Sequence, residues 1–539
     1  MAKTASDGMT PQEVWAQLRA DWLVIGEEGE QAREKEKRWV EQVSDRVRQL
    51  EAHQQSDQKS HRSQINRSQA NGSKQLALVA ETDLSDFLAG FLAALLAGWD
   101  VALANPHWGS REWTSLAALI TPDIIWGQQV PCQSLLPSAV QPTRLNPAAE
   151  PAILIPTGGS TGHIKLARHT WSSLITSVSG FRHFFAPDGS PINAYCVLPV
   201  YHVSGLMPIL RAWLSDAQVV LTPFKHLEKT FSSPLHFSPS VSARLSPSQS
   251  FISLVPTQLE RLLQAGASAW LSQFKAVLLG GAPPWPALLD RARAQHIPLW
   301  LSYGMTETAA MVSVQSAQAL SSSSPRGVSS GKALPHATLQ IVKASQPLPA
   351  EQIGQVVVQS GAIAQGYYAQ SSPAFKSGTF YTDDLGYLSA DGHLYITGRA
   401  SGKIISGGEN IFPAEVEAAI RDTCQVKDVC VLGWPHAEWG EMAIALYVPA
   451  HDQVSAASLR AALLAPRPED PTPALSRYKH PKQWVPVQDL PRNRQGKLNR
   501  AAVLAQLQAQ LQAQSSEHST PLSNRTAQLS ADDGGGSGY

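Results

Sequence analysis

Short apolar runs alternate with helix-like stretches from about residue 76 onward. The runs that we expect to form buried strands are Leu76–Val79, Val101–Leu103, Ala152–Ile155, Cys196–Leu198, Val219–Leu221, Phe251–Val255 and Ala276–Leu279. Apolar residues recur at helical spacing between them, in Leu84–Gly98, Arg111–Ile120, Gln258–Gln264 and Pro286–Gln295. Strands that alternate with helices are typical of βαβ units. The pattern therefore predicts an α/β fold with mainly parallel sheets.

The pattern changes to β after about Ser330. Short alternating segments with glycine turns between them predict strands at Gln355–Gln359, Thr379–Thr382 and His393–Thr397. Beyond the segment 398–403 the chain reads as a separate, smaller α+β domain. Its expected helices and strands are Pro413–Asp422, Val426–Leu432, Glu441–Val448, Ala456–Leu464 and Trp484–Val487.

The two ends of the chain are polar. Residues 27–51 form the pattern of one amphipathic helix, with Trp39, Val40, Val43, Val47 and Leu50 as its apolar stripe, and residues 53–74 read as a loop. We assign this helix no function. The expected organisation is a polar N-terminal extension (1–75), a large domain (76–398), a smaller mobile domain (399–511) and a disordered tail (512–539) that ends in GGGSGY.

Composition narrows the class of protein. Lys plus Arg and Asp plus Glu number 43 each, so no strong overall charge favours nucleic acid or an anionic membrane. The four cysteines form no CxxC pair, which indicates free thiols in a reducing compartment. The apolar stretch 87–99 is too short to cross a bilayer. We expect a soluble, cytoplasmic protein without stable membrane insertion, and the sequence leaves open whether it forms a homo-oligomer.

One glycine-rich loop carries candidate chemistry. The strand Ala152–Ile155 is followed by Thr157, Gly158, Gly159, Ser160, Thr161 and Gly162, and then by Lys165. Small residues let backbone N–H groups approach an anion, and hydroxyls and a lysine add donors and charge. The spacing is not that of a Walker A loop. Read alone, the loop also fits a G-x-S-x-G nucleophile elbow with Ser160, or a plain surface turn.

Four further motifs follow this loop in order. They are Ser302–Thr308 (SYGMTET), Thr382–Gly386 (TDDLG), Gly398-Arg399 followed by residues 404–410, and Pro491–Lys497 (PRNRQGK). With the loop, they resemble the signature motifs of the adenylate-forming superfamily of acyl-CoA synthetases, luciferases and peptide-synthetase adenylation domains. The resemblance covers residues 76–511.

That resemblance implies ATP, Mg²⁺ and CoA as substrates and cofactor, and it assigns roles to residues. It implies that Thr157–Lys165 hold the β- and γ-phosphates, with Lys165 neutralising the pyrophosphate that leaves. Tyr303 would stack on adenine, and Gly304 beside it would belong to the ATP/AMP-binding residues. Gly280, Gly281 and Ala282 would line the nucleotide, and Asp384 and Arg399 would contact the ribose hydroxyls. Thr306 and Glu307 would face the phosphates, with Glu307 as the metal ligand. Lys497 would reach the α-phosphate during adenylation.

The resemblance also implies a second half-reaction with a thiol. In related enzymes the C-terminal domain rotates about a hinge, which corresponds here to Ser401. Gly407 and Gly408 would border the pantetheine path of CoA. The chain departs from the family pattern at Asp383 and Leu166, where glycines are usual, which puts loop geometry in doubt more than activity.

A finer resemblance concerns the acid. The stretches 87–106, 155–171, 197–205 and 406–415 are similar to the o-succinylbenzoate–CoA ligases of phylloquinone and menaquinone biosynthesis, in their cyanobacterial form. This implies His202 beside the acyl pocket. Ser204 and Arg211 lie seven residues apart on the helix expected after His202, and hence on one face of it. We expect Arg211 to bind the carboxylate that is not activated; the alternative is that Arg211 points to solvent. The alternatives are a ligase for another aromatic or fatty acid, a serine hydrolase using Ser160, and a non-enzymatic protein on the same fold.

Overall fold

The structure is a computed structural model that describes most of the chain. The described residues are 9–18, 22–25, 30–62, 74–108, 110–128, 130, 150–158, 164–232, 245–319, 328–402, 404–406, 409–411, 413–436, 440–465, 475, 479–493 and 496–517. Contacts divide the chain into a larger unit, residues 1–403 with 494–497, and a smaller unit, residues 404–493 with 498–539. The division falls at 403/404 instead of the expected 398/399. Each unit is described by itself.

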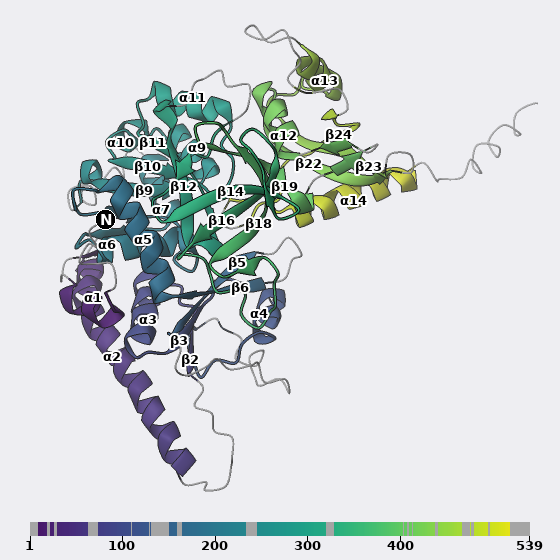
Figure 1. Ribbon diagram of the computed structural model, residues 1–539. Helices are drawn as coiled ribbons and strands as arrows, with labels where there is room; N and C mark the ends of the chain where they lie inside the picture. Colours follow the sequence, from purple (N-terminus) through teal and green to yellow (C-terminus); the bar gives the residue numbers. More distant parts are fainter. Residues whose placement is uncertain are drawn as a thin grey trace, which may run out of the picture. The chain divides into compact units, whose positions relative to one another are not determined.

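The largest sheet of the larger unit has eight strands in the order β1-β8-β7-β9-β10-β11-β12-β13 (Figure 1). In that order their bounds are Leu23–Ile25, Val219–Leu221, Asn193–Cys196, Ser250–Leu254, Ala276–Leu279, Leu299–Met305, Ala310–Ser316 and Lys332–Ala333. Pairing is parallel from β1 to β11 and antiparallel beyond it. The carboxyl ends of neighbouring parallel strands lie at one edge, so the residues that follow β10 and β11 lie close together.

A second sheet has the order β4-β2-β3-β5-β6. In that order its bounds are Ile124–Trp126, Leu76–Val79, Asp100–Leu103, Ala152–Gly158 and Ile164–Thr170. The first four strands pair parallel, and β5 and β6 form an antiparallel hairpin. β5 runs to Gly158, beyond the expected end at Ile155, because its last residues pair with the start of β6.

The third sheet is antiparallel and is formed by strands after residue 330, where the pattern predicts β structure. Its order is β15-β14-β16-β18-β17, and β19 pairs with β18. In the order β15, β14, β16, β18, β17, β19 the bounds are Gln346–Pro347, Ala337–Lys343, Gly354–Ser360, Thr379–Leu388, Phe375–Lys376 and Leu394–Arg399. β18 continues through the TDDLG motif, so Asp384 lies on a strand and not in a turn.

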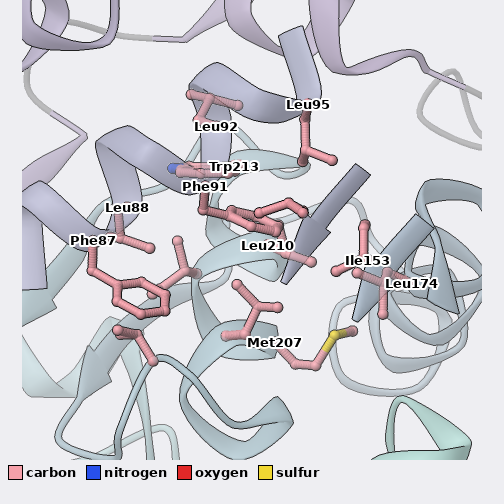
Figure 2. Packing of buried hydrophobic residues seen from close by; sticks show 14 of the residues in the cluster. Phe87, Leu88, Phe91, Leu92, Leu95, Ile153, Leu174, Met207, Leu210 and Trp213 are labelled. Atoms are coloured by element: carbon pink, nitrogen blue, oxygen red, sulfur yellow. The ribbon is translucent and has the colours of Figure 1, made fainter. Parts of the chain in front are cut away.

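The helices of the larger unit pack against these sheets. Their bounds are α1 Pro11–Gln17, α2 Glu30–Arg62, α3 Leu84–Leu96, α4 Ser110–Ala117, α5 Trp171–Phe185, α6 Val203–Trp213, α7 Phe224–Ser232, α9 Pro256–Gln264, α10 Ser268–Leu271 and α11 Pro286–Ala294. Figure 2 shows the core that α3 forms with β5, α5 and α6. α3 is apolar on nearly all sides, and every residue from Phe87 to Leu95 is therefore buried. No helix among the described residues is both long and apolar enough to cross a membrane.

The N-terminal segment, expected as an extension outside the large domain, contributes to the larger unit. β1 pairs with β8 at the edge of the eight-stranded sheet, and α2 lies beside α3 (Figure 1). Trp39 Nε1 donates a hydrogen bond of 2.9 Å to the Ser85 carbonyl. Val40, expected in the apolar stripe, is 40% exposed. Successive residues of a helix lie about 100° apart, so Val40 points away from the packed face on which Trp39 lies. α2 also extends through Arg62 into the segment expected as a loop.

The smaller unit is a compact α+β domain. Its sheet has the order β21-β20-β23-β22, and β24 pairs parallel with β23. In the order β21, β20, β23, β22, β24 the bounds are Glu409–Ile411, Ile404–Ser406, Gly440–Pro449, Val426–His436 and Gln483–Pro486. The helices are α12 Pro413–Asp422, α13 Ala456–Leu464 and α14 Arg500–Glu517. The two units confirm the expected fold class: a large α/β part with mainly parallel sheets and a smaller α+β part.

Candidate active site

The glycine-rich loop connects β5 to β6. The backbone pairs Thr157 with Lys165 and Gly158 with Ile164, which fixes the two ends of the loop opposite each other. Gly159, Ser160, Thr161 and Gly162 lie outside the described residues. Alternate residues of a strand share a face, so Lys165 and His169 project from the same side of β6.

The SYGMTET motif forms the end of β11 and the turn that follows it. The β11–β12 pairing shifts register between Tyr303 and Gly304. A Cβ at Gly304 would lie 1.9 Å from the carbonyl oxygen of Ala310, so only glycine fits this close approach of two strands. A 3-10 turn over Thr306–Thr308 follows. The Glu307 side chain is buried, with 7% of the residue exposed.

His169 holds this turn, a contact that the sequence analysis did not anticipate. Its ring is buried, and Nε2 lies 2.8 Å from the carbonyl oxygen of Thr306, to which it donates. Nδ1 lies 3.0 Å from the Ser173 hydroxyl. Burial lowers the pKa of His169 to about 4, so the ring is neutral at pH 7. Lys165 and His169 lie an even number of positions apart on β6, and this spacing was the sequence signal that could have placed His169 on the side of the site.

Hydrogen bonds join Tyr303, Asp384 and Arg399, which lie on three different strands. The Tyr303 hydroxyl donates to Asp384 Oδ2 at 2.8 Å, and Arg399 Nε donates to Asp384 Oδ1 at 2.9 Å. Asp384 and Arg399 are cross-strand partners on β18 and β19. Burial, with the nearby Asp384 carboxylate, raises the pKa of Tyr303 well above its usual range. The phenol therefore stays protonated and keeps its role as a donor.

Gly280, Gly281 and Ala282 follow β10 and lie at the same sheet edge. A Cβ at Gly280 would lie 2.6 Å from the Ser302 hydroxyl, which precedes Tyr303. Gly281 has φ +81°, and a Cβ there would lie 3.3 Å from Cε of Lys497. Residues 494–497 belong to the larger unit by their contacts. Lys497 is thus placed beside the glycines expected to line the nucleotide.

His202 and Arg211 both lie in the α6 region, but in different surroundings. His202 is the N-cap residue of α6 and makes a hydrogen bond with the Pro156 carbonyl at the start of the glycine-rich loop. Burial lowers its pKa to about 4. Ser204 is exposed. Arg211 is 3% exposed, lies 4.0 Å from the centre of the Phe181 ring and has no hydrogen-bond partner for Nε among the described residues.

The remaining predicted residues concern the second half-reaction. Ser401 lies in a 3-10 turn over Ala400–Gly402 that follows β19. Gly407 and Gly408 lie outside the described residues. Their proposed roles therefore rest on the motif alone.

Among the described residues no group of three or more metal-binding side chains is present, and the buried Glu307 carboxylate is the candidate ligand of a magnesium ion. Glu307 Oε1 accepts a hydrogen bond of 2.7 Å from the Tyr367 hydroxyl, a second contact that the motifs did not indicate. Among the described residues, no hydrogen bond reaches the other carboxylate oxygen. A hard cation prefers oxygen ligands, and the Glu307 carboxylate would hold it beside the Thr306 hydroxyl.

Comparisons with known proteins show which family the chain resembles. The model of the AMP-binding enzyme family matches residues 125–368, and that of the AMP-binding enzyme C-terminal domain matches residues 415–497. The 2-succinylbenzoate–CoA ligase of Listeria monocytogenes is 32% identical over 356 residues, 64% of this chain and 68% of that protein. The ligase of the same name from Oceanobacillus iheyensis is 31% identical over 360 residues, 64% of this chain and 67% of that protein.

A solved structure shares the fold. It is the o-succinylbenzoate CoA synthetase (MenE) from Bacillus subtilis in complex with the acyl-adenylate intermediate OSB-AMP, which matches with a TM-score of 0.68 at 23% identity over 91% of this chain and 96% of that chain. The matches to the two family models and to the Listeria monocytogenes relative show that the chain belongs to the AMP-binding enzyme family. The family resemblance and the fold expected from the sequence are thereby confirmed.

Proposed function

We propose that the protein is an ATP-dependent 2-succinylbenzoate–CoA ligase. It joins o-succinylbenzoate to CoA and converts ATP to AMP and diphosphate, through an acyl adenylate. The observation that carries this proposal is the joint presence of the adenylate-forming motif residues in one unit of a chain whose relatives bear that enzyme name. It is an acid–thiol ligase of the phylloquinone and menaquinone pathway, and we place it in the cytoplasm.

In the first half-reaction a substrate carboxylate oxygen attacks the α-phosphorus of ATP, and diphosphate leaves. Such chemistry depends on positioning and charge stabilisation. Lys165 and the glycine-rich loop, with Ser160 as a hydroxyl donor, hold the departing phosphates. Mg²⁺ bound at Glu307 would supply further positive charge. Tyr303 lies against the adenine, Asp384 and Arg399 bind the ribose, and Lys497 contacts the α-phosphate.

In the second half-reaction the CoA thiolate attacks the acyl carbon, and AMP leaves. Lys497 is not needed for this step, so we propose that rotation about Ser401 withdraws it. Gly407 and Gly408 then border the path of pantetheine, because residues without side chains leave room for it. The hinge and these two glycines are assigned from the motif.

The second carboxylate of the substrate requires a cation or several donors when it is buried. Arg211 is suited to this role because no carboxylate pairs with it among the described residues. Burial lowers its pKa to about 9, so it stays cationic at neutral pH. A buried cation without a counter-charge is costly, and a substrate carboxylate would offset that cost. We place His202 at the other end of α6, beside the acyl group that is activated.

The test is a screen of carboxylic acids for diphosphate release, with detection of the CoA thioester. We expect o-succinylbenzoate to give the highest kcat/KM. A different aromatic or fatty acid as the best substrate would leave the ligase class intact and overturn the specific assignment. ATP-independent ester cleavage that is lost in Ser160→Ala would instead support the hydrolase alternative.

A further inference from the structure

Three segments that are remote in sequence meet at Tyr367. The backbone of residues 365–368 pairs with β6: Gln365 N donates to the Arg168 carbonyl at 2.8 Å, and Tyr368 N donates to the Leu166 carbonyl at 2.8 Å. Immediately before this stretch, Ala364 N donates to the Glu307 carbonyl at 2.9 Å. The backbone at Tyr367 is thus fixed both to the strand of Lys165 and to the turn of Glu307.

The Tyr367 side chain contacts both charged groups. Its hydroxyl donates to Glu307 Oε1 at 2.7 Å, and the Lys165 ammonium lies 4.8 Å from the centre of its ring. Phe375 packs edge-on against the same ring, with centroids 5.1 Å apart. One half-buried aromatic residue is therefore held in place while it contacts a cation through its face and an anion through its hydroxyl.

These contacts keep two opposite charges separate. No ion pair joins Lys165 to Glu307 within the described part of the chain. A direct pair would neutralise the carboxylate that a metal needs and would withdraw the ammonium from the phosphates. A neutral hydroxyl donor orients the carboxylate without cancelling its charge.

We propose that Tyr367 is a positioning residue of the phosphate site: its hydroxyl orients Glu307 for the metal, and its ring face places Lys165 for the phosphates. The proposal rests on the proposed ATP-dependent function. Tyr367 lies outside the five motifs described above, and its contacts with Glu307 and Lys165 were not expected from them. Removal of the hydroxyl should weaken only the Mg²⁺-dependent part of nucleotide binding, which passes through Glu307. Removal of the ring should weaken that part and also the Mg²⁺-independent part, which passes through Lys165.

The experiment measures ATP binding by calorimetry, with and without Mg²⁺, without any acid. For Tyr367→Phe we expect the Kd for ATP with Mg²⁺ to rise about tenfold, in line with the loss of a hydrogen bond to a charged group. The Kd without Mg²⁺ should change less than about twofold. Tyr367→Leu should weaken ATP binding under both conditions. Introduced into Glu307→Gln, Tyr367→Phe should have little further effect, since its role passes through that carboxylate.

A matched control is Tyr195→Phe. The Tyr195 hydroxyl is a donor as well, but it is buried and donates to a backbone carbonyl, that of Leu245, at 2.5 Å. This variant should lose thermal stability but not Mg²⁺-dependent ATP binding. Equal weakening of ATP binding by Tyr367→Phe with and without Mg²⁺, or an unchanged effect in Glu307→Gln, would overturn the proposal. Normal ATP binding by the unmodified protein without thioester formation would instead contradict the proposed function alone.

Discussion

Tyr303 and Asp384, 81 residues apart in the chain, are joined by a hydrogen bond of 2.8 Å from the phenol to Oδ2. The other carboxylate oxygen accepts from Arg399 Nε at 2.9 Å. Asp384 thus connects Tyr303, which we expect at the adenine, with Arg399, which we expect at the ribose. The Asp384 carboxylate orients both side chains.

Replacing this carboxylate should weaken nucleotide binding. We expect Asp384→Asn to raise the KM for ATP at least about tenfold, because a hydrogen bond to a charged group contributes roughly 1.5–3 kcal/mol. The KM for the acid should change little. Asp452→Asn is the control, since that side chain is exposed and lies in the smaller unit. Steady-state kinetics in ATP measures both, and equal effects of the two variants would contradict the role of Asp384.

Lys497 should serve only the first half-reaction. We expect Lys497→Ala to reduce adenylate formation at least about a hundredfold, the order of loss seen when a group that stabilises developing charge is removed. A supplied acyl adenylate should still be converted to the thioester. Lys343→Ala, at an exposed end of β14, is the control. Diphosphate exchange and thioester formation measure the two steps, and equal failure of both would exclude the rotating-domain scheme.

Arg211 should act on the acid and not on ATP. We expect Arg211→Met to raise the KM for o-succinylbenzoate at least about tenfold, since a charged hydrogen bond to the second carboxylate is lost. Thermal stability should stay equal or rise, because the variant removes a buried unpaired charge and keeps an apolar stem. Arg211→Lys should retain part of the binding. A fall in stability with unchanged KM would show that Arg211 is structural.

His169 should make stability depend on pH. Its pKa is about 4 in the folded chain, below the usual 6.5 of histidine. Between these values the unfolded chain binds more protons, so stability should fall as pH decreases from about 6.5 to about 4. We expect His169→Gln to show a smaller decrease in Tm across this window. A parallel decrease in both proteins would assign the effect to other groups, such as His202, whose pKa is also about 4.

Gly304 should tolerate no side chain. Since a Cβ would lie 1.9 Å from the Ala310 oxygen, Gly304→Ala should separate β11 from β12 and lower both the Tm and the affinity for ATP. Gly361→Ala is a suitable control, because there the nearest atom is a methyl of Thr176 at 3.3 Å. Thermal unfolding measures the difference. Equal stability of the two variants would show that the β11–β12 pairing can relax.

Much of the fold followed from local patterns. The strands Leu76–Val79, Val219–Leu221 and Ala276–Leu279 have the predicted bounds. Less was visible at the N-terminus, where β1 has only three residues in a polar segment and forms through pairing with β8. Propensity alone does not indicate so short a strand, because its stability comes from the neighbour it pairs with.

The sequence by itself determined the chemistry, because loop glycines, hydroxyls, carboxylates and lysines in a fixed order can be recognised without coordinates. The motifs indicated Tyr303, Asp384 and Arg399 as nucleotide-binding residues, and in the structure hydrogen bonds join their side chains. Only the tertiary structure decided which residues outside the motifs support them. His169 reaches Thr306 across 137 residues, and Tyr367 reaches Glu307 across 60. Such contacts depend on how sheets and loops pack, and local sequence patterns carry no information on that packing.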